Sequence, residues 1–382
     1  MNRLLHLTYD SPDNPWCGGG GAYRDWRILG NLPGWEREVW TGKHPAGSLL
    51  PTDSVRKDLG IGMFGEFFSR RTYAWSASRH LRRKLSDPGI VVSHSVSAWA
   101  PVWESLRHQR RTLNIVHHIA GDEILKRLGP FGPASLRYEN RTMREGKFFS
   151  LSNRATAIRI REVNPSARIE MIPIGFDPPS SPAAPERVAQ GPVICFLGRM
   201  DHRMKGLDRL LEAFAIVGSR LPDAHLVIAG RSDSSMKGWL DARLREHPHS
   251  DRVHVFPNPD DARKYALLDG SDIFCVPSRF EGWCIAAVEA QSRGLPVVAT
   301  RTDGTSDSVN EGETGILVEN DEAGCAGHLA AAMEALCVDV ELRRKLGEAA
   351  KIWASRFTWE SAEKATLEFL GEVAQSAEAI RA

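Results

Sequence analysis

The chain has 382 residues, which is enough for two domains of about 150 to 200 residues each. A hydrophobic content of 42% and a charged content of 25% are ordinary for a soluble globular protein. No apolar run approaches the roughly 18 to 20 residues that a membrane-spanning helix needs. The apolar run in residues 1–9 indicates a first strand and is too short for a signal peptide.

The net charge is only +1, but it is unevenly distributed. Residues 1–182 contain 26 lysines and arginines against 17 acidic residues, whereas the remainder has 23 against 31. A basic N-terminal half favours an anionic partner or surface. Much of the excess lies in residues 70–84, mixed with Phe67, Phe68, Tyr73 and Trp75. This segment is either an amphipathic helix at a membrane surface or, as we expect, a solvated helix face with aromatic core anchors. Nucleic-acid binding is disfavoured because no binding motif accompanies the charge.

The six cysteines show no CxxC pair and no spacing typical of a metal site. Most of them lie in apolar runs, which is typical of reduced core thiols. We therefore predict a cytoplasmic protein, with peripheral contact at the inner membrane face as an open alternative. The cysteines are Cys17, Cys195, Cys275, Cys284, Cys325 and Cys337.

Short apolar strands alternate with helical patterns, which predicts an α/β fold of two doubly wound, Rossmann-like domains. The Pro-rich stretch 178–185 separates them, because so many prolines cannot continue a helix or a central strand. We predict domains at 1–178 and 186–361, with their sheets facing a ligand-binding cleft. The predicted strands are 4–9, 38–41, 90–94, 112–117, 148–152 and 169–173, then 193–197, 225–229, 253–256, 273–277, 296–300 and 316–318.

The first strand is followed by four glycines, Gly18 to Gly21. Glycines in a strand-to-helix turn let the backbone approach a bulky anion closely, so Gly19 and Gly20 are candidate ligand-binding residues. The alternative is a plain surface loop. A dinucleotide fingerprint requires a third glycine where this chain has Tyr23, which disfavours nicotinamide cofactors.

The second domain opens with a strand that ends at Gly198 and Arg199, followed by Lys205 and Gly206 before a helix predicted from Leu207 to Arg220. Arg199 and Lys205 therefore lie at the carboxyl end of a strand and just before a helix. From these positions a guanidinium and an ammonium can hold a diphosphate.

Two carboxylates lie eight residues apart, with Glu281 in a predicted strand-to-helix loop and Glu289 in a helix predicted from Ile285 to Ser292. A loop that leads into a helix N-terminus favours anions. Eight residues along a helix span about 12 Å, whereas glycosidase carboxylates lie roughly 5 to 9.5 Å apart. Hydrolysis by this pair is therefore disfavoured, and ordinary helix-start and solvated acids remain the structural alternative.

These motifs resemble those of the retaining GT-B glycosyltransferases of the glycosyl transferases group 1 type. The resemblance covers residues 193–359 well and the first domain only in places. It implies that Glu281 contacts the donor sugar, that Glu289 binds the ribose, and that Arg199 and Lys205 bind the pyrophosphate. It also places Arg231, Gly282, Trp283, Cys284 and Ile285 at the donor, Gly19 and Gly20 at its phosphates, and a last helix, about 362–382, on the N-terminal domain.

The chain departs from the family pattern at two places. The family's Glu-Gly-Phe-Gly is Glu281-Gly282-Trp283-Cys284 here, and a cysteine side chain narrows the sugar pocket. The family's Val-His-Asp step is Val116-His117-His118 here, although His117 keeps its place at a strand end as a candidate catalytic residue. Asp122 and Glu123 are weaker candidates for acceptor binding, and His94 is another strand-end histidine.

The resemblance implies a hexosyltransferase that moves a sugar from a UDP- or GDP-type nucleotide-diphosphate donor to a hydroxyl of a natural product, glycan or lipid. No Asp-x-Asp motif occurs in the sequence, so we predict a metal-independent enzyme without a cofactor. Two alternatives stay open. One is a nucleotide-sugar epimerase of the same architecture, and the other is a non-catalytic partner subunit.

Overall fold

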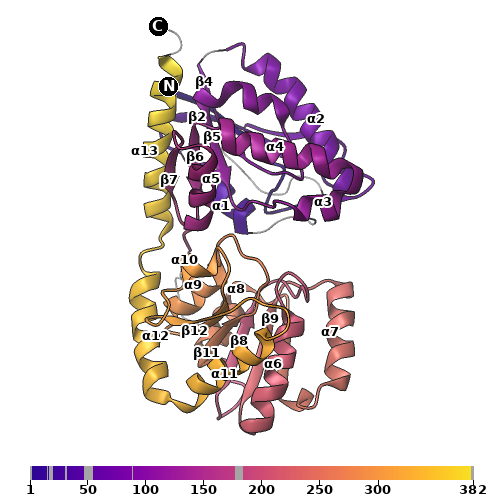
Figure 1. The fold of residues 1–382 in the computed structure, drawn as a ribbon, viewed down its shortest axis with the longest axis vertical. Helices are drawn as coiled ribbons and strands as arrows, with labels where there is room; N and C mark the ends of the chain where they lie inside the picture. Colours follow the sequence, from indigo (N-terminus) through magenta and orange to yellow (C-terminus); the bar gives the residue numbers. More distant parts are fainter. Residues whose placement is uncertain are drawn as a thin grey trace. The chain divides into compact units, whose positions relative to one another are not determined.

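The computed structural model describes residues 2–14, 16, 20–30, 32–46, 55–87, 89–176 and 184–379. The chain divides into two compact units, which we describe separately (Figure 1). The first comprises Met1–Gly175 and Trp359–Ala382, and the second comprises Phe176–Thr358. Most of the proposed Pro-rich linker, 178–185, lies outside the described residues. Each unit is built on a parallel sheet, which confirms the predicted α/β class.

The first unit has a seven-stranded sheet in the order β3-β2-β1-β4-β5-β6-β7, and all neighbouring strands are parallel. Its strands are β1 (Asn2–Leu7), β2 (Trp35–Gly42), β3 (Val55–Leu59), β4 (Ile90–Ser95), β5 (Thr112–Val116), β6 (Phe148–Leu151) and β7 (Arg168–Met171). Its α-helices are α1 (Gly20–Leu29), α2 (Glu66–Lys84), α3 (Glu123–Leu128), α4 (Gly132–Glu145), α5 (Arg154–Val163) and α13 (Trp359–Glu378), with short 3₁₀ helices η1 (Trp103–Arg111) and η2 (Gly129–Phe131).

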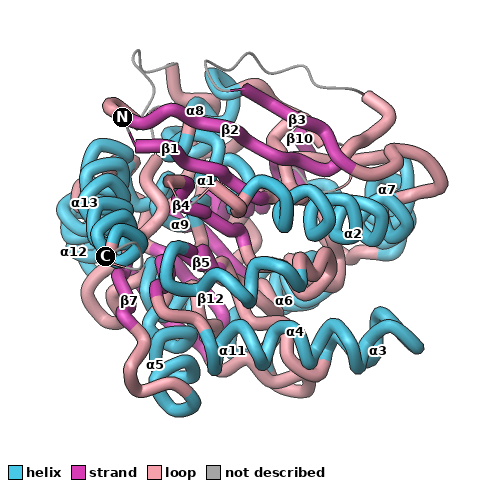
Figure 2. The backbone as a smooth tube through the Cα atoms, turned by 90° about the horizontal axis from the view of Figure 1, so that it is seen from above, coloured by secondary structure: helices cyan, strands magenta, loops and turns pink. Residues whose placement is uncertain are grey.

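Side-chain alternation along the strands assigns the helices of this unit to two faces of the sheet. Leu5 and Leu7 of β1 pack in one apolar cluster with Leu81 of α2, and Figure 2 shows α2 alongside the first strands. The intervening His6 points to the other face, where its ring approaches α1. Phe148 of β6 contacts Phe369 of α13 there, with ring centroids 5.9 Å apart. The last helix therefore belongs to the first unit.

The second unit has a six-stranded parallel sheet in the order β10-β9-β8-β11-β12-β13. Its strands are β8 (Val193–Leu197), β9 (His225–Gly230), β10 (Val253–Pro257), β11 (Ile273–Val276), β12 (Val297–Thr300) and β13 (Gly315–Val318). Its helices are α6 (Leu207–Arg220), α7 (Ser234–Glu246), α8 (Asp261–Asp269), α9 (Ile285–Ser292), α10 (Thr305–Ser308), α11 (Cys325–Val338) and α12 (Val340–Ala354), with the 3₁₀ helix η3 (Ser250–Arg252).

Two apolar clusters sandwich this second sheet. Ile194 and Phe196 of β8 pack with α6 and α11 on one face. Val193 and Cys195 point the opposite way and pack with α8 and α9. A central strand that is apolar at every position is expected where both faces of a parallel sheet are covered. The sheet is thus buried on both sides, and its strand ends and loops remain available for binding.

The structure corrects one expectation about α2. Tyr73 is buried, as expected of a core anchor, but Phe67, Phe68 and Trp75 are exposed. The cysteine prediction fares better, because Cys195, Cys275, Cys284, Cys325 and Cys337 are free and buried, while Cys17 lies outside the described residues. None of the helices in the described part of the chain is both long and apolar enough to span a membrane.

Candidate active site

The strand order of the second unit brings the two halves of the predicted donor site together. β8 lies between β9 and β11, so the chain reverses its direction of winding at this strand. In doubly wound sheets, ligands bind at the carboxyl ends of the strands beside such a reversal. The loop after β8 carries Arg199 and Lys205, and the loop after β11 carries Glu281. Residues 76 positions apart in sequence therefore meet at one edge of the sheet.

Gly206 fixes how closely these two loops approach. It has a left-handed backbone (φ 69°), and a Cβ built on it would lie 2.0 Å from the Pro277 carbonyl oxygen. Only glycine tolerates both conditions. Arg279 links the same loops. Its backbone N–H donates to the Met204 carbonyl (3.1 Å), and its guanidinium donates to both Asp208 carboxylate oxygens at 2.8 Å. The Lys-Gly step thus positions Lys205 as well as supplying its charge.

Lys205 and Glu281 form an ion pair in which the Nζ–Oε1 distance is 2.7 Å. The Ser278 hydroxyl donates to the same carboxylate oxygen at 2.7 Å. Glu281 is buried, whereas 28% of the Lys205 side chain is exposed. Burial alone would lower the pKa of Lys205, but the Glu281 carboxylate outweighs it and raises the pKa above its ordinary value. Lys205 is therefore a protonated cation throughout the physiological range.

Arg199 is the second cation at this edge. Its guanidinium lies 3.4 Å from Asp201. Because both side chains are positive, Arg199 acts to lower the pKa of Lys205. Its Nε atom is buried without a hydrogen-bond partner among the described residues. Arg231 follows β9 with an exposed side chain, and its carbonyl accepts the Met200 N–H at 2.8 Å. The loops after β8 and β9 therefore run side by side at this edge.

The turn after Glu281 leads directly into α9, whose predicted bounds are confirmed. Cys284 precedes the helix at Ile285, and the first turn of a helix leaves N–H groups without intrahelical partners. Cys284 is buried, and burial raises the pKa of its thiol to about 12. Trp283 packs edge-on against Phe357, and its indole N–H is buried without a partner in the described structure. Gly282 is half-buried in the same turn.

Glu289 is the fifth residue of α9 and therefore lies about one turn into the helix, which begins at Ile285. The estimate of about 12 Å between the two carboxylates assumed a continuous helix, so it does not hold. Glu289 has its own cation, with Lys264 Nζ 2.9 Å from Oε1, and the Tyr265 hydroxyl donates at 3.3 Å. Burial alone would lower the pKa of Lys264, but the Glu289 carboxylate raises it above its ordinary value. Each carboxylate thus neutralises a different lysine.

The first unit holds a second constellation around His117, which directly follows β5. Its Nε2 atom lies 3.1 Å from an Asp25 oxygen and 3.2 Å from the Ser95 hydroxyl, which also donates to Asp25. A Cβ on Gly21 would lie 3.0 Å from the His117 ring, so the start of α1 packs directly against the imidazole. The side chain of His117 is 23% exposed, so one side of the ring remains accessible.

Asp25, Arg24 and His6 complete this constellation, and the sequence analysis missed all three. Arg24 Nη1 lies 3.2 Å from Asp25 Oδ1, and all three side chains are buried. Burial alone would raise the pKa of Asp25, but His117, His6 and Arg24 together lower it well below its usual range. Burial lowers the pKa of His6 to about 4, so His6 is neutral. Polar residues on the buried face of α1 were the signal in the sequence.

The remaining predicted residues lie apart from this constellation or outside the described structure. Gly20 is the exposed first residue of α1, and Gly19 lies outside the described residues. Asp122 and Glu123 are exposed, and Glu123 pairs with lysine and arginine of its own helix. His94 is buried beside Tyr138, at 3.5 Å from its hydroxyl.

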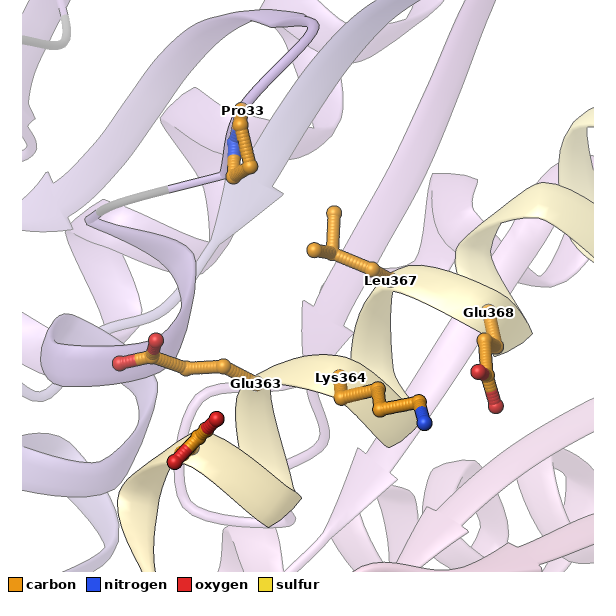
Figure 3. A pocket seen from close by; sticks show the side chains of 6 residues that line it. Pro33, Glu363, Lys364, Leu367 and Glu368 are labelled. Atoms are coloured by element: carbon orange, nitrogen blue, oxygen red, sulfur yellow. The ribbon is translucent and has the colours of Figure 1, made fainter.

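A surface pocket of about 530 Å³ lies along α13 in the first unit. Figure 3 shows Pro33 across from side chains of this helix. None of the predicted site residues lines it. The lining residues are Pro33, Glu360, Glu363, Lys364, Leu367 and Glu368. Among the residues that the structure describes, no group of three or more His, Cys, Asp or Glu side chains is placed to hold a metal ion. Metal independence remains a prediction.

Comparisons with known proteins separate the two halves of the chain. Residues 180–353 match the family described as glycosyl transferases group 1. A D-inositol 3-phosphate glycosyltransferase of Arthrobacter sp. (strain FB24) is 34% identical over 46% of this chain and 41% of the relative. A phosphatidyl-myo-inositol mannosyltransferase of Mycobacterium leprae (strain TN) is 33% identical over 49% of each. The chain thus spans about half the length of the curated relatives it matches.

Solved structures extend the likeness of fold to nearly the whole chain. A sucrose-phosphate synthase from Thermosynechococcus elongatus superposes with a TM-score of 0.76 at 18% identity, over 96% of this chain and 98% of the other. Anabaena HepE, solved with UDP and glucose, gives a TM-score of 0.73 at 18% identity, over 97% of this chain and all of the other. The family match covers the unit that holds Arg199, Lys205, Glu281 and Glu289. Residues 180–353 thus resemble the glycosyl transferases group 1 family in sequence, and the chain has the GT-B fold.

Proposed function

We propose that this protein is a retaining glycosyltransferase that moves a hexose from a nucleotide-diphosphate sugar, of the UDP or GDP type, to a hydroxyl acceptor. The observation that carries the proposal is the partly buried Lys205–Glu281 pair, which lies in the loops that also carry Arg199 and lead into α9. A diphosphate needs cations and N–H donors on one side, and a sugar needs hydrogen-bonding groups close by. This edge of the second sheet offers both.

The leaving group explains why the cations matter. When the bond between sugar and diphosphate breaks, negative charge develops on the phosphate oxygens. Lys205, Arg199 and the first turn of α9 would stabilise that charge through preorganised positive groups. Arg231 would lie at the same edge. In this proposal the departing phosphate accepts the acceptor's proton during front-face attack, and neither a metal nor a cofactor takes part.

The carboxylates would orient the carbohydrate portions of the donor. Glu281, fixed by Ser278 and Lys205, would accept hydrogen bonds from the sugar hydroxyls, with Gly282, Trp283, Cys284 and Ile285 forming the turn beneath. The unpartnered indole N–H of Trp283 would be a further donor. Glu289, held by Lys264, would accept from the ribose hydroxyls.

The first unit would contribute His117 and the glycines at the start of α1. Asp25 keeps the His117 ring oriented, and its accessible side would contact the sugar. The inositol-directed names of the curated relatives support a hydroxyl acceptor. The co-crystallised UDP and glucose of Anabaena HepE support a nucleotide-sugar donor. Natural products, glycans and lipids all remain acceptor classes for this chain, and its proposed location is cytoplasmic.

The test is donor binding followed by transfer. Calorimetric titration with UDP-, GDP- and ADP-sugars, with and without EDTA, identifies the nucleotide and tests metal independence. Lys205→Met should reduce transfer by about 10² to 10³ fold, the usual loss when one transition-state donor is removed. Lys237→Met is the matched control, because Lys237 pairs with Asp241 on the exposed face of α7. Full transfer activity in folded Lys205→Met would refute the assignment.

Product analysis separates the alternatives. A retaining transferase gives a product with the donor's anomeric configuration, which NMR reads directly. A nucleotide-sugar epimerase would convert the donor without any acceptor present. A partner subunit would bind donor weakly or not at all, and the loss of charge in Lys205→Met would then leave donor titrations unchanged.

A further inference from the structure

Exposed aromatic side chains cluster on one face of the first unit. Phe64 and Trp75 are 77% and 67% exposed, and Phe67 and Phe68 are also exposed. Phe64 lies just before α2, Phe67 and Phe68 lie in its first turn, and Trp75 lies near its middle. Phe131 of η2 packs against Phe67. Globular proteins rarely expose a contiguous apolar patch without using it for binding. We call this set the aromatic face: Ile61, Met63, Phe64, Phe67, Phe68, Trp75 and Phe131.

Four rings of the aromatic face pack in two pairs. Phe64 meets Phe68 edge-on with centroids 5.6 Å apart, and Phe67 lies 5.5 Å from Phe131. Ile61 and Met63, in the loop before α2, are exposed as well. Exposed apolar side chains are thus gathered in the loop before α2 and on the helix itself, in contrast to single surface residues that need no explanation.

Phe64 is held outward by an uncommon backbone. Its φ is 65°, in the left-handed region that bulky residues seldom adopt, and Gly65 follows with φ 88°. Such strain persists where the surrounding structure fixes it, and it gathers at functional positions. Here the strained residue is among the most exposed aromatic side chains of the described chain. Exposure of a phenyl ring to water is unfavourable, so this position favours a partner surface that buries the ring.

Arginines are interleaved with these rings. The Arg71 guanidinium lies 5.4 Å from the Phe67 ring and 5.2 Å from the Phe131 ring, and it donates to Ser135 at 3.1 Å. The Arg79 guanidinium lies 5.7 Å from the Trp75 ring. Further along α2, Arg82 and Arg83 are exposed in the last turns of the helix. The face thus combines apolar rings with a row of positive charge.

We propose that the aromatic face docks this protein onto an anionic phospholipid bilayer. The rings would enter the boundary between headgroups and acyl chains, and the arginines would meet the lipid phosphates. Charge complementarity selects this partner, because the half of the chain that carries the face has 26 lysines and arginines against 17 acidic residues. The proposal does not depend on the transferase function, and its test does not use activity.

The test is co-sedimentation of the full chain with vesicles. One set contains phosphatidylcholine alone, and the other contains equal parts of phosphatidylcholine and phosphatidylglycerol. We expect binding to the second set only. Phe64→Ser combined with Trp75→Ser should abolish it, and Arg82→Ser combined with Arg83→Ser should weaken it by about tenfold or more. These side chains are exposed, so circular dichroism should report intact folding.

Helix α5 supplies a matched control in the same unit. It exposes Ile158, Arg159, Arg161 and Val163, which are two apolar and two basic side chains. Their replacement by serine should leave vesicle binding unchanged. If the α5 variant loses as much vesicle binding as the aromatic-face variant, or if the wild type does not bind anionic vesicles, the proposal is wrong. Sedimentation of wild type with a nucleic acid, but not with vesicles, would assign the charge to another partner and would also refute it.

A spectroscopic readout locates the docking surface. Vesicles with brominated acyl chains quench tryptophans that enter the bilayer. The wild-type chain should be quenched more than Trp75→Phe, because Trp75 is 67% exposed on the proposed face. Equal quenching of the two proteins would show that a different surface binds, and it would overturn the proposal.

Discussion

The two units place charged groups in opposite ways. In the second unit, Lys205 pairs with Glu281 at a partly open edge, and each partner comes from a short motif in the sequence. In the first unit, Asp25 and Arg24 are buried behind His117, and the Asp25–His117 contact joins residues 92 positions apart. The family match covers the second arrangement and leaves the first unmatched. Local motifs thus record the proposed donor chemistry, whereas the other network depends on the fold of its unit.

Asp25→Asn should produce the largest effect on stability. It leaves the Arg24 guanidinium buried without its counter-charge, which typically costs about 3 to 5 kcal/mol. Hydrogen exchange read by mass spectrometry should show loss of protection in peptides of the first unit and little change in the second. The control is Asp87→Asn, a surface partner of Arg3, with an effect below about 1 kcal/mol. Equal loss of protection in both units would contradict the contrast drawn here.

Mild acid should weaken the first unit next. Burial lowers the pKa of His6 to about 4 and of His94 to about 3, from an ordinary 6.5. Both folded-state values are depressed, so their stabilisation is complete above pH 6.5 and is lost as the pH falls towards 4. The slope approaches about 1.4 kcal/mol per pH unit for each histidine. Unfolding curves between neutral pH and the pKa of His6 should show this, and His6→Gln should reduce the slope.

The Lys205–Glu281 pair of the second unit has a pH dependence of stability with the opposite sign. Its Lys205 has a raised pKa, so the stabilisation is present below the ordinary value of 10.5 and is lost only as the pH rises above it. The titration of Lys205 should therefore add no pH dependence to the protection of second-unit peptides between neutral pH and 10.5. Loss of the Lys205 ammonium between neutral pH and 10.5, observed by NMR, would contradict this.

Glu281→Gln should cost less stability than Asp25→Asn and more activity. Lys205 is 28% exposed, so its ammonium can turn to solvent, and we expect a loss of about 1 to 2 kcal/mol. Transfer should fall by about 10² fold or more, as for lost transition-state groups. Glu334→Gln is a matched control, because Glu334 holds Arg220 at the same 2.7 Å on the surface. Full activity in Glu281→Gln would show that Glu281 does not make the proposed contact with the sugar.

Gly21→Ala should have the smallest effect on stability. The added Cβ meets the His117 ring at 3.0 Å, so the imidazole must shift by a few tenths of an ångström. Alanine favours a helix over glycine by up to about 1 kcal/mol, which offsets the crowding. We expect nearly unchanged unfolding and a several-fold slower transfer, since catalysis is sensitive to displacements of about 1 Å. A fall in stability with unchanged transfer would make His117 merely structural.

The sequence predicted those parts of the molecule that depend on local patterns. The bounds of α6 and α9 are confirmed, because apolar spacing and flanking glycines mark them. Strand β3 was missed, since its sequence Val55–Leu59 contains three consecutive charged residues. An edge strand that pairs only with β2 can carry such residues, because one of its sides is open to water.

The group of residues around His117 could not be predicted from the sequence for a different reason. Asp25, Arg24 and His6 look like ordinary residues of a helix and a strand until the fold brings α1 against β1 and β5. The orientation of α2 also depended on tertiary packing. Its aromatic residues occur on several sides of the helix, so the pattern alone could not tell Tyr73, which is buried, from Trp75, which is exposed.

The pairing of each carboxylate with its own lysine has a consequence for the proposed donor site before a ligand binds. Lys205 is neutralised by Glu281, and Lys264 by Glu289, before any substrate arrives. Chloride or inorganic phosphate from the cell therefore gains little by entering, because it would have to displace an anion that is already tethered in place. The proposed nucleotide-sugar donor would do so, because its hydroxyls would give the displaced carboxylates new partners. On this proposal the site would disfavour simple salts and still accept a ligand that satisfies both charges at once.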